Sequence, residues 1–79
     1  MDFNEAGRAM CKSSGMTMSH VSARLGSGPG RFSQMLKRNN PSLPTLLRVC
    51  DALGYEVWLS PVGTRLPDGS LVIDEARRG

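Results

Sequence analysis

The chain is poor in the residues on which catalysis and metal binding depend. Among its 79 residues there is one histidine, His20, and there are two cysteines, Cys11 and Cys50. They form no Cys-x-x-Cys pair and no His/Cys cluster with the spacing of zinc ligands. A Ser/His/acid triad would need a carboxylate near His20, but every acid lies toward one of the two chain ends. We therefore predict no enzymatic activity, no cofactor and no metal site.

Long apolar runs are also absent. No stretch approaches the roughly 20 apolar residues that cross a bilayer, and the first residues lack the apolar run and cleavage site of a secretory signal. The two separated cysteines indicate reduced thiols that fill apolar space. We expect one small cytoplasmic domain without a membrane partner, and a chain this short is expected to gain stability from oligomerisation.

Negative charge is missing from the middle of the chain. Residues 6–50, here called the basic block, contain no Asp or Glu but seven Lys or Arg, and they lie between two acidic ends. Charge of a single sign favours a polyanionic partner such as nucleic acid, although a solvated basic surface gives the same composition. The seven cations are Arg8, Lys12, Arg24, Arg31, Lys37, Arg38 and Arg48.

Two helices are predicted in the first third of the chain. Phe3, Ala6 and Met10 lie at helical spacing, which predicts a helix that begins near the N-terminus. Thr17 is the predicted N-cap of a second, shorter helix that ends at Gly26.

A third helix is predicted after this glycine turn, with Pro29 at its first position, where a missing N–H costs nothing. Phe32, Met35 and Leu36 fall on one side of it. The opposite side is polar and basic, and it consists of Gly30, Arg31, Ser33, Gln34, Lys37 and Arg38.

A fourth helix has the strongest periodicity in the chain. Pro41 separates it from the third helix, because the residue before a proline avoids helical geometry. Ser42 is its predicted N-cap and Gly54 its end. The predicted buried stripe consists of Leu43, Leu46, Leu47, Cys50 and Leu53.

After the fourth helix the hydrophobic period changes to 2. Residues 55–60 alternate, which predicts a strand. Residues 66–70 contain a Pro-Asp-Gly turn between residues 62–66 and 71–73, which predicts a β-hairpin. Residues 75–79 predict a flexible tail.

Together these patterns predict a mostly α fold. Residues 1–54 are expected to form a compact helix-turn-helix domain of four to five helices, and residues 55–74 a short β extension that serves dimerisation. The strands can pair within one chain, between two chains, or with another protein. The residues predicted for a dimer interface are Tyr55, Val57, Trp58 and Leu59.

The outward side of the third helix carries groups that read base pairs. The major groove of B-DNA is about 12 Å wide and admits one helix. Gln34 can pair with adenine, and Arg31 or Lys37 can reach guanine or a phosphate. Each of these residues, taken alone, fits a solvated helix face equally well. Supporting contacts are predicted from the backbone near Thr17, Ser27, Gly28 and Gly30 and from the side chains of Arg38, Asn39 and Asn40.

Several short segments occur in an order that is typical of one family. They are Met16-Thr17, Val21-Ser22, Leu25-Gly26, Phe32-Ser33, Asn40-Pro41-Ser42-Leu43, Thr45-Leu46-Leu47 and Ala52-Leu53-Gly54. In this combination residues 16–54 resemble the phage-repressor-like (Cro- or XRE-type) helix-turn-helix domains. The resemblance implies a compact all-α domain that binds DNA as a dimer. It also implies DNA contacts from Thr17, Met18, Gly28, Gly30, Arg31, Ser33, Gln34 and Lys37.

Two features of the chain depart from this family. Met18 stands where many members have a glutamine that contacts a phosphate. Cys11 and Leu36 stand where many members pair a buried arginine with a glutamate. Because both partners are apolar here, no buried charge is left unpaired. We predict that Cys11 packs near Leu36.

The predicted function is sequence-specific binding of double-stranded DNA. The chain would be a transcriptional regulator, of the repressor type, from a bacterium or a mobile element, acting as a homodimer with its third helix in the major groove. The alternative is an antitoxin or another protein-interaction module whose C-terminal strands bind a partner protein such as a toxin.

Overall fold

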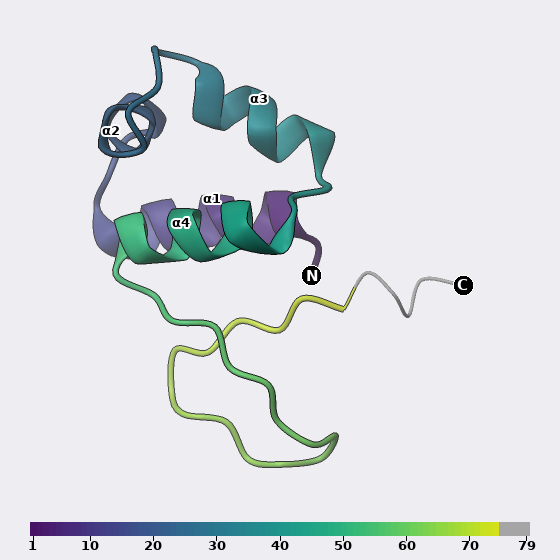
Figure 1. The fold of residues 1–79 in the computed structure, drawn as a ribbon. Helices are drawn as coiled ribbons and strands as arrows, with labels where there is room; N and C mark the ends of the chain where they lie inside the picture. The colour runs from purple at the N-terminus through teal and green to yellow at the C-terminus, as the bar shows by residue number, and fades with distance from the viewer. Residues whose placement is uncertain (75–79) are drawn as a thin grey trace.

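The computed structural model describes residues 1–74, which contain four helices. α1 and α4 lie side by side, α2 crosses one end of this pair, and α3 lies over it (Figure 1). The prediction of a mostly α fold is confirmed, with four helices in the described part of the chain. None of these helices has the length and apolar character that a bilayer crossing requires. The helices are α1 (Phe3–Ser14), α2 (Met18–Arg24), α3 (Arg31–Arg38) and α4 (Leu43–Leu53).

Short polar side chains begin three of the helices. Asp2 accepts a hydrogen bond from the N–H of Glu5 at the start of α1, over 2.8 Å. Thr17 and Ser42 do the same for α2 and α4, accepting from the N–H three residues further on. Each oxygen satisfies a first-turn donor that has no partner inside its helix. The predicted N-caps Thr17 and Ser42 are confirmed.

The start of α3 differs from the prediction. We expected Pro29 at its first position, but the helix begins two residues later, at Arg31. Gly30 is the N-cap residue and has φ 81°, a left-handed conformation that a right-handed helix cannot contain. Pro29 therefore belongs to the turn that joins α2 to α3.

All four helices contribute to one apolar core. Phe3 and Met10 from α1, Val21 from α2 and Leu36 from α3 are all at most 3% exposed. Cys11 is buried in the same cluster as Leu36, as predicted from the departure at these two positions. Further core residues are Phe32, Val49, Cys50 and Leu53.

Gly7 lets α1 approach α3 closely. A Cβ atom placed on Gly7 would lie 2.3 Å from Cδ2 of Leu36, a distance that real Cβ contacts do not show. The glycine is therefore a packing residue: the Leu36 side chain occupies the space beside it.

The buried stripe of α4 is rotated from the predicted one. Leu43 is 63% exposed and Leu47 is 46% exposed, whereas Val49, which the prediction omitted, is fully buried. The stripe that faces the core begins at Leu46 rather than Leu43 and continues through Cys50 to Leu53. Two apolar stripes overlap on this helix, and periodicity does not tell which of them meets the other helices.

The predicted β extension is wrong for the described chain, because none of residues 1–74 forms a strand. Residues 55–66 leave the helices in an open loop (Figure 1). A strand needs a neighbour for its N–H and C=O groups, and the N–H groups of residues 56–60 have no partner among the described residues. The predicted turn does form, since the Ser70 N–H donates to the Pro67 carbonyl over 3.2 Å.

The two ends of the described chain meet. The Asp74 N–H donates to the Met1 carbonyl over 3.1 Å, and the Met1 amino group donates to the Val72 carbonyl over 3.1 Å and to the Asp74 carboxylate over 2.5 Å. These bonds return the C-terminal segment to the start of α1. The predicted tail, residues 75–79, lies outside the described residues.

Candidate nucleic-acid interface

The outer face of α3 is polar and basic, and its inner face is anchored in the core. Phe32 and Leu36 are both fully buried, and Met35 is half-buried against the same cluster. These three residues fix the rotation of α3 about its axis as predicted, but Ser33, which was predicted on the outer side, is half-buried. The exposed side chains on its outer face are Arg31, Gln34, Lys37 and Arg38.

The cations of this face have no partner among residues 1–74. The side chains of Arg31, Lys37 and Arg38 form no hydrogen bond or ion pair with any other described residue. No acid lies on α3 itself, because the whole basic block lacks Asp and Glu. Their charge is therefore available to an anionic ligand.

Ser22 holds the start of α3 in place. This residue of α2 is fully buried, and its Oγ accepts a hydrogen bond from the Phe32 N–H over 3.0 Å. Gly30, at the N-cap of α3, has no side chain that could satisfy this donor. Ser22 thus caps α3 from a neighbouring helix, and its own carbonyl accepts from the Ser27 N–H over 2.9 Å. A serine on the apolar side of a short helix indicates a buried hydroxyl, but the sequence does not show its partner, which lies ten residues further on.

The turn between α2 and α3 presents bare backbone to solvent. Gly28 and Gly30 are exposed, and a Cβ atom on either would meet nothing within 4 Å. A ligand can therefore contact the main chain here, because no side chain of Gly28 or Gly30 stands in the way. Ser27, predicted to offer its N–H to a phosphate, donates that group to Ser22 instead.

The start of α2 offers fewer groups for DNA contact than predicted. The hydroxyl oxygen of Thr17 accepts from the His20 N–H over 3.1 Å, so this N–H is engaged within the protein. Met18 is half-buried and packs against the core. Its thioether therefore contributes to packing. His20 is exposed.

Asn39 connects the end of α3 to the start of α1. It adopts φ 55°, a left-handed conformation that asparagine tolerates better than most residues. Its Oδ1 accepts from the Asn4 N–H over 2.9 Å, and its Nδ2 donates to the Asp2 carboxylate over 3.3 Å. This predicted DNA contact thus also fixes the far end of α3.

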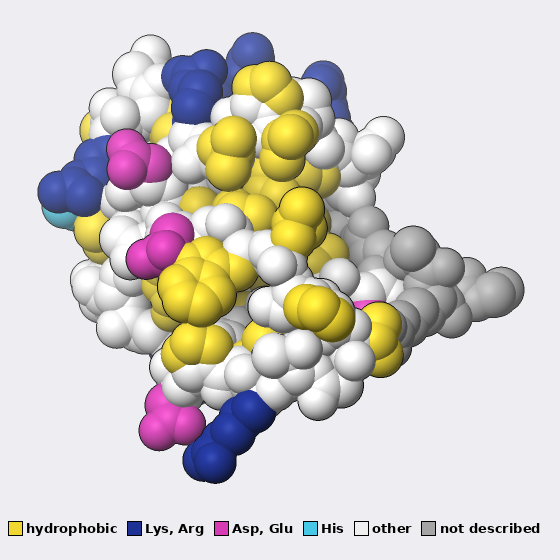
Figure 2. All heavy atoms as spheres, turned by 60° about the horizontal axis from the view of Figure 1, so that its bottom comes forward, with side chains coloured by type: hydrophobic (Ala, Val, Ile, Leu, Met, Phe, Trp, Pro, Cys, Tyr) yellow, Lys and Arg dark blue, Asp and Glu magenta, His cyan; other side chains and the backbone are white. Residues whose placement is uncertain are grey.

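The residues predicted for dimerisation differ in exposure. Tyr55 is half-buried against the core, whereas Trp58 is 61% and Leu59 is 99% exposed. The indole N–H of Trp58 donates to the Glu56 carboxylate. Figure 2 brings this side of the molecule forward and shows hydrophobic side chains gathered across it. The exposed apolar residues of α4 and of the segment after it include Leu43, Leu47, Val57, Trp58, Leu59 and Val62.

Two ionisable groups of the core have shifted pKa values. Burial raises the pKa of the Cys11 and Cys50 thiols, and the positive charge of Arg8 only partly opposes this shift at Cys11. Both cysteines are therefore neutral thiols in the core at neutral pH, as predicted. No group of three His, Cys, Asp or Glu residues within residues 1–74 is placed to hold a metal ion.

Comparison with known proteins agrees with this geometry. Residues 8–57 match the model of the Cro/C1-type HTH DNA-binding domain, and this match covers more than half of the chain. Searches of curated proteins and of solved structures return no significant match. The matched segment includes α2, α3 and the turn between them. In this part of the chain the basic helix α3 is held by the buried Ser22 and by two core residues, Phe32 and Leu36. The chain therefore belongs to the Cro/C1-type family of helix-turn-helix DNA-binding domains, which are not enzymes.

Proposed function

We propose that this protein is a transcriptional regulator that binds double-stranded DNA in a sequence-specific manner with α3 in the major groove. The observation that carries the proposal is the outer face of α3. Its exposed cations and Gln34 lie opposite Phe32 and Leu36, which are fully buried in the core. In this proposal Gln34 pairs with adenine, and Arg31 or Lys37 pairs with guanine. The helix is short, so only a few base pairs per protomer can be read directly.

Contacts with the DNA backbone complete the proposed footprint. Arg38 lies in the last turn of α3, where its charge can reach a phosphate and set the register of the helix. The exposed backbone of Gly28 and Gly30 allows the turn to lie close to the sugar-phosphate chain. Further residues proposed at the rim are Thr17, Met18, Ser33 and Asn39, together with the side chain of Ser27, since its N–H donates to Ser22.

We further propose that the protein acts as a homodimer. The segment around Trp58 and Leu59 exposes apolar side chains and unpaired backbone N–H groups, both of which a second copy can cover. Two recognition helices related by a two-fold axis would read half-sites about 34 Å apart. A dimer that occupies an operator in this way can block transcription, which supports the repressor type.

The same exposed segment supports a second candidate function, that of an antitoxin. Val57, Trp58 and Leu59 would then pack against a partner protein such as a toxin rather than against a second copy. The two functions are compatible, since α3 and this segment lie on opposite sides of the α1 and α4 pair (Figure 1).

Selection of binding sites from random duplex DNA tests the proposal. We expect an enriched palindromic site whose affinity falls steeply with salt, because bound cations release counterions from phosphates. Gln34→Ala should weaken binding to that site by about 1–3 kcal/mol and relax the preference at one base position. An equal loss on random DNA would show that Gln34 reads no base, and failure to enrich any site would refute sequence-specific binding. Sedimentation of wild type and of Trp58→Ser would test the dimer without DNA.

A further inference from the structure

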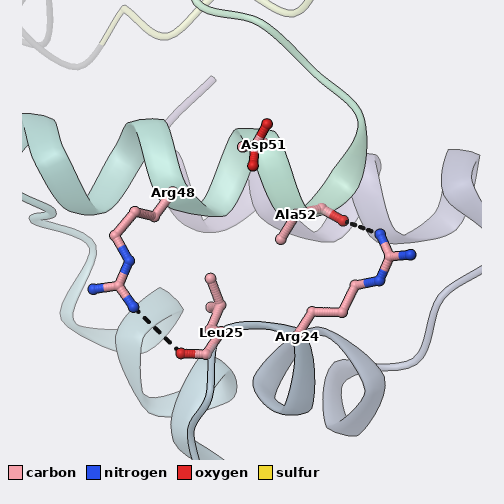
Figure 3. Close-up of a pocket in the computed structure, with 5 residues that line it drawn as sticks. All are labelled: Arg24, Leu25, Arg48, Asp51 and Ala52. Carbon is pink, nitrogen blue, oxygen red and sulfur yellow. Dashed lines mark hydrogen bonds between the residues drawn. The ribbon is translucent and has the colours of Figure 1, made fainter.

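Two arginines of the basic block bond to protein carbonyls. Arg24, the last residue of α2, donates from Nη1 to the Ala52 carbonyl over 2.9 Å. Arg48, in α4, donates from Nη2 to the Leu25 carbonyl over 3.3 Å. Figure 3 shows these two bonds on either side of a cavity, one reaching from α2 to α4 and the other from α4 to α2. We call this pair of bonds the arginine clamp.

Both acceptors lie where a helix ends. Leu25 is the C-cap of α2, and Ala52 belongs to the last turn of α4. The last carbonyls of a helix have no N–H partner within it, and a cation near this end also interacts favourably with the helix dipole. Arg24 of α2 thus caps the end of α4, and Arg48 of α4 caps the end of α2. The other carbonyls at the end of α4 accept from Gly54 N–H, Tyr55 N–H and the Ser14 hydroxyl.

No acid in the described chain competes for the two guanidinium groups. Asp51 lines the same cavity (Figure 3) but forms no ion pair with Arg24 or Arg48 among the described residues. Carbonyl oxygens are therefore the partners that hold both side chains across the cavity.

The clamp acts on the turn that leads to α3. The Leu25 carbonyl, held by Arg48, immediately precedes Gly26, where the chain leaves α2 with φ 73°. From there the chain passes through Ser27, which is held by Ser22, into the recognition helix. Arg48 and Arg24 thereby fix α2 and this turn on α4, which does not contribute to the proposed reading face.

We propose that Arg24 and Arg48 are positioning residues for sequence-specific DNA binding, which hold the helix-turn-helix on α4 and contact no phosphate. This inference rests on the proposed function, since it concerns the pose in which α3 enters the groove. It assigns two of the seven cations of the basic block to hydrogen bonds within the protein rather than to the DNA.

The variants Arg24→Met and Arg48→Met test the clamp, because methionine keeps an apolar stem and removes the guanidinium. Affinity is measured at several salt concentrations, well below the unfolding temperature, for the selected site and for random duplex DNA. Loss of one charge-assisted hydrogen bond is expected to weaken binding to the selected site about tenfold. Affinity for random DNA and the salt slope should stay at the wild-type values.

Two further variants calibrate this measurement. Arg38→Met should weaken binding to both duplexes and lower the salt slope by about 0.9, the value for one phosphate contact. Arg65→Met removes a cation from the exposed C-terminal segment and should leave both affinities unchanged. A lowered salt slope in Arg24→Met or Arg48→Met would show that this arginine contacts a phosphate. An unchanged ratio of the affinities for the selected site and for random DNA would show that the clamp does not position α3 for recognition. Either result overturns the proposal.

A measurement without DNA separates the clamp from the proposed function. Amide hydrogen exchange at Gly26 and Ser27 should accelerate in Arg48→Met and not in Arg65→Met, because only the first variant frees the turn from α4. If the wild-type protein selects no DNA site, the proposed function fails, and the exchange rates still decide whether Arg48 holds the turn. Unchanged exchange in Arg48→Met overturns the clamp.

Discussion

The most informative single substitution in this protein is Ser22→Ala. It removes one oxygen atom and leaves the buried N–H of Phe32 without the partner it has at 3.0 Å. The N–H belongs to the first turn of α3, so no carbonyl of the helix can replace the lost acceptor. The N-cap residue, Gly30, cannot replace it either.

The cost follows from the burial of this donor. An unsatisfied buried N–H costs about 1–3 kcal/mol. The whole free energy of unfolding of a domain this size is about 4–12 kcal/mol, so the loss is a large part of the total. Since about 1 kcal/mol moves the Tm of a domain this small by roughly 4–8 °C, a loss near 2 kcal/mol predicts a fall of about 8–16 °C.

Urea denaturation and thermal unfolding measure this effect. The urea midpoint and the Tm should both fall while the m-value stays the same, since the unfolded surface does not change. Ser19→Ala, which alters an exposed serine of the same helix, is the matched control and should change the Tm little. If Ser22→Ala unfolds at the wild-type temperature, the hydroxyl does not cap α3 and our account of how this helix is held is wrong.

Three further substitutions or conditions test the packing. Gly7→Ala should lower the free energy of unfolding by about 1–3 kcal/mol through overpacking against Leu36, whereas Gly28→Ala, in open space, should be neutral in urea denaturation. Asn39→Ala should lower the free energy of unfolding by about 1–2 kcal/mol, because it loses the bond from the Asn4 N–H and strains a left-handed backbone. Asn39→Gly should avoid the strain but still lose the bond, so in thermal melts its Tm should lie between those of Asn39→Ala and the wild type. Burial raises the pKa of both cysteines, so the unfolded chain ionises first and stability should fall as pH rises above about 8.5. A pH series of urea midpoints that stays flat from pH 8 to 10 would contradict this.

The four helices and the N-caps of α2 and α4 could be predicted because the interactions that define them are local, whereas the start of α3 was placed two residues too early. Thr17 and Ser42 bond to N–H groups three residues away, and Gly54 ends α4 through its own left-handed conformation. The sidedness of α3 was also readable, because its apolar and basic residues separate cleanly on a helical wheel. These signals need no knowledge of the rest of the fold.

The roles of Ser22 and Asn39 could not be predicted, because their partners are distant in sequence. Ser22 meets Phe32 ten residues on, and Asn39 meets Asn4 thirty-five residues back. The rotation of α4 was misjudged for the same reason: which stripe is buried depends on where three other helices lie. The predicted strand failed because alternation describes a strand's faces but supplies no neighbour for its backbone.

Hydrogen bonds within the protein reduce the number of basic-block cations that remain available to DNA phosphates. Of its seven cations, three donate to protein oxygens: Arg8 to the Asn4 side chain over 3.1 Å, and the two clamp arginines to carbonyls. The four cations without such a bond among the described residues are Lys12, Arg31, Lys37 and Arg38.

This difference sets an upper limit on what the basic block contributes to the salt dependence of DNA binding. At about 0.9 per phosphate contact, four cations limit the magnitude of the slope to about 3.6 per protomer and about 7 for a dimer. Seven contacts per protomer would instead give about 13 for a dimer. A dimer slope well above about 7, measured in a variant in which Arg65, Arg77 and Arg78 are replaced, would mean that the internal bonds of Arg8, Arg24 and Arg48 break when DNA binds. A slope at or below that limit would mean that these three arginines keep their protein partners in the complex.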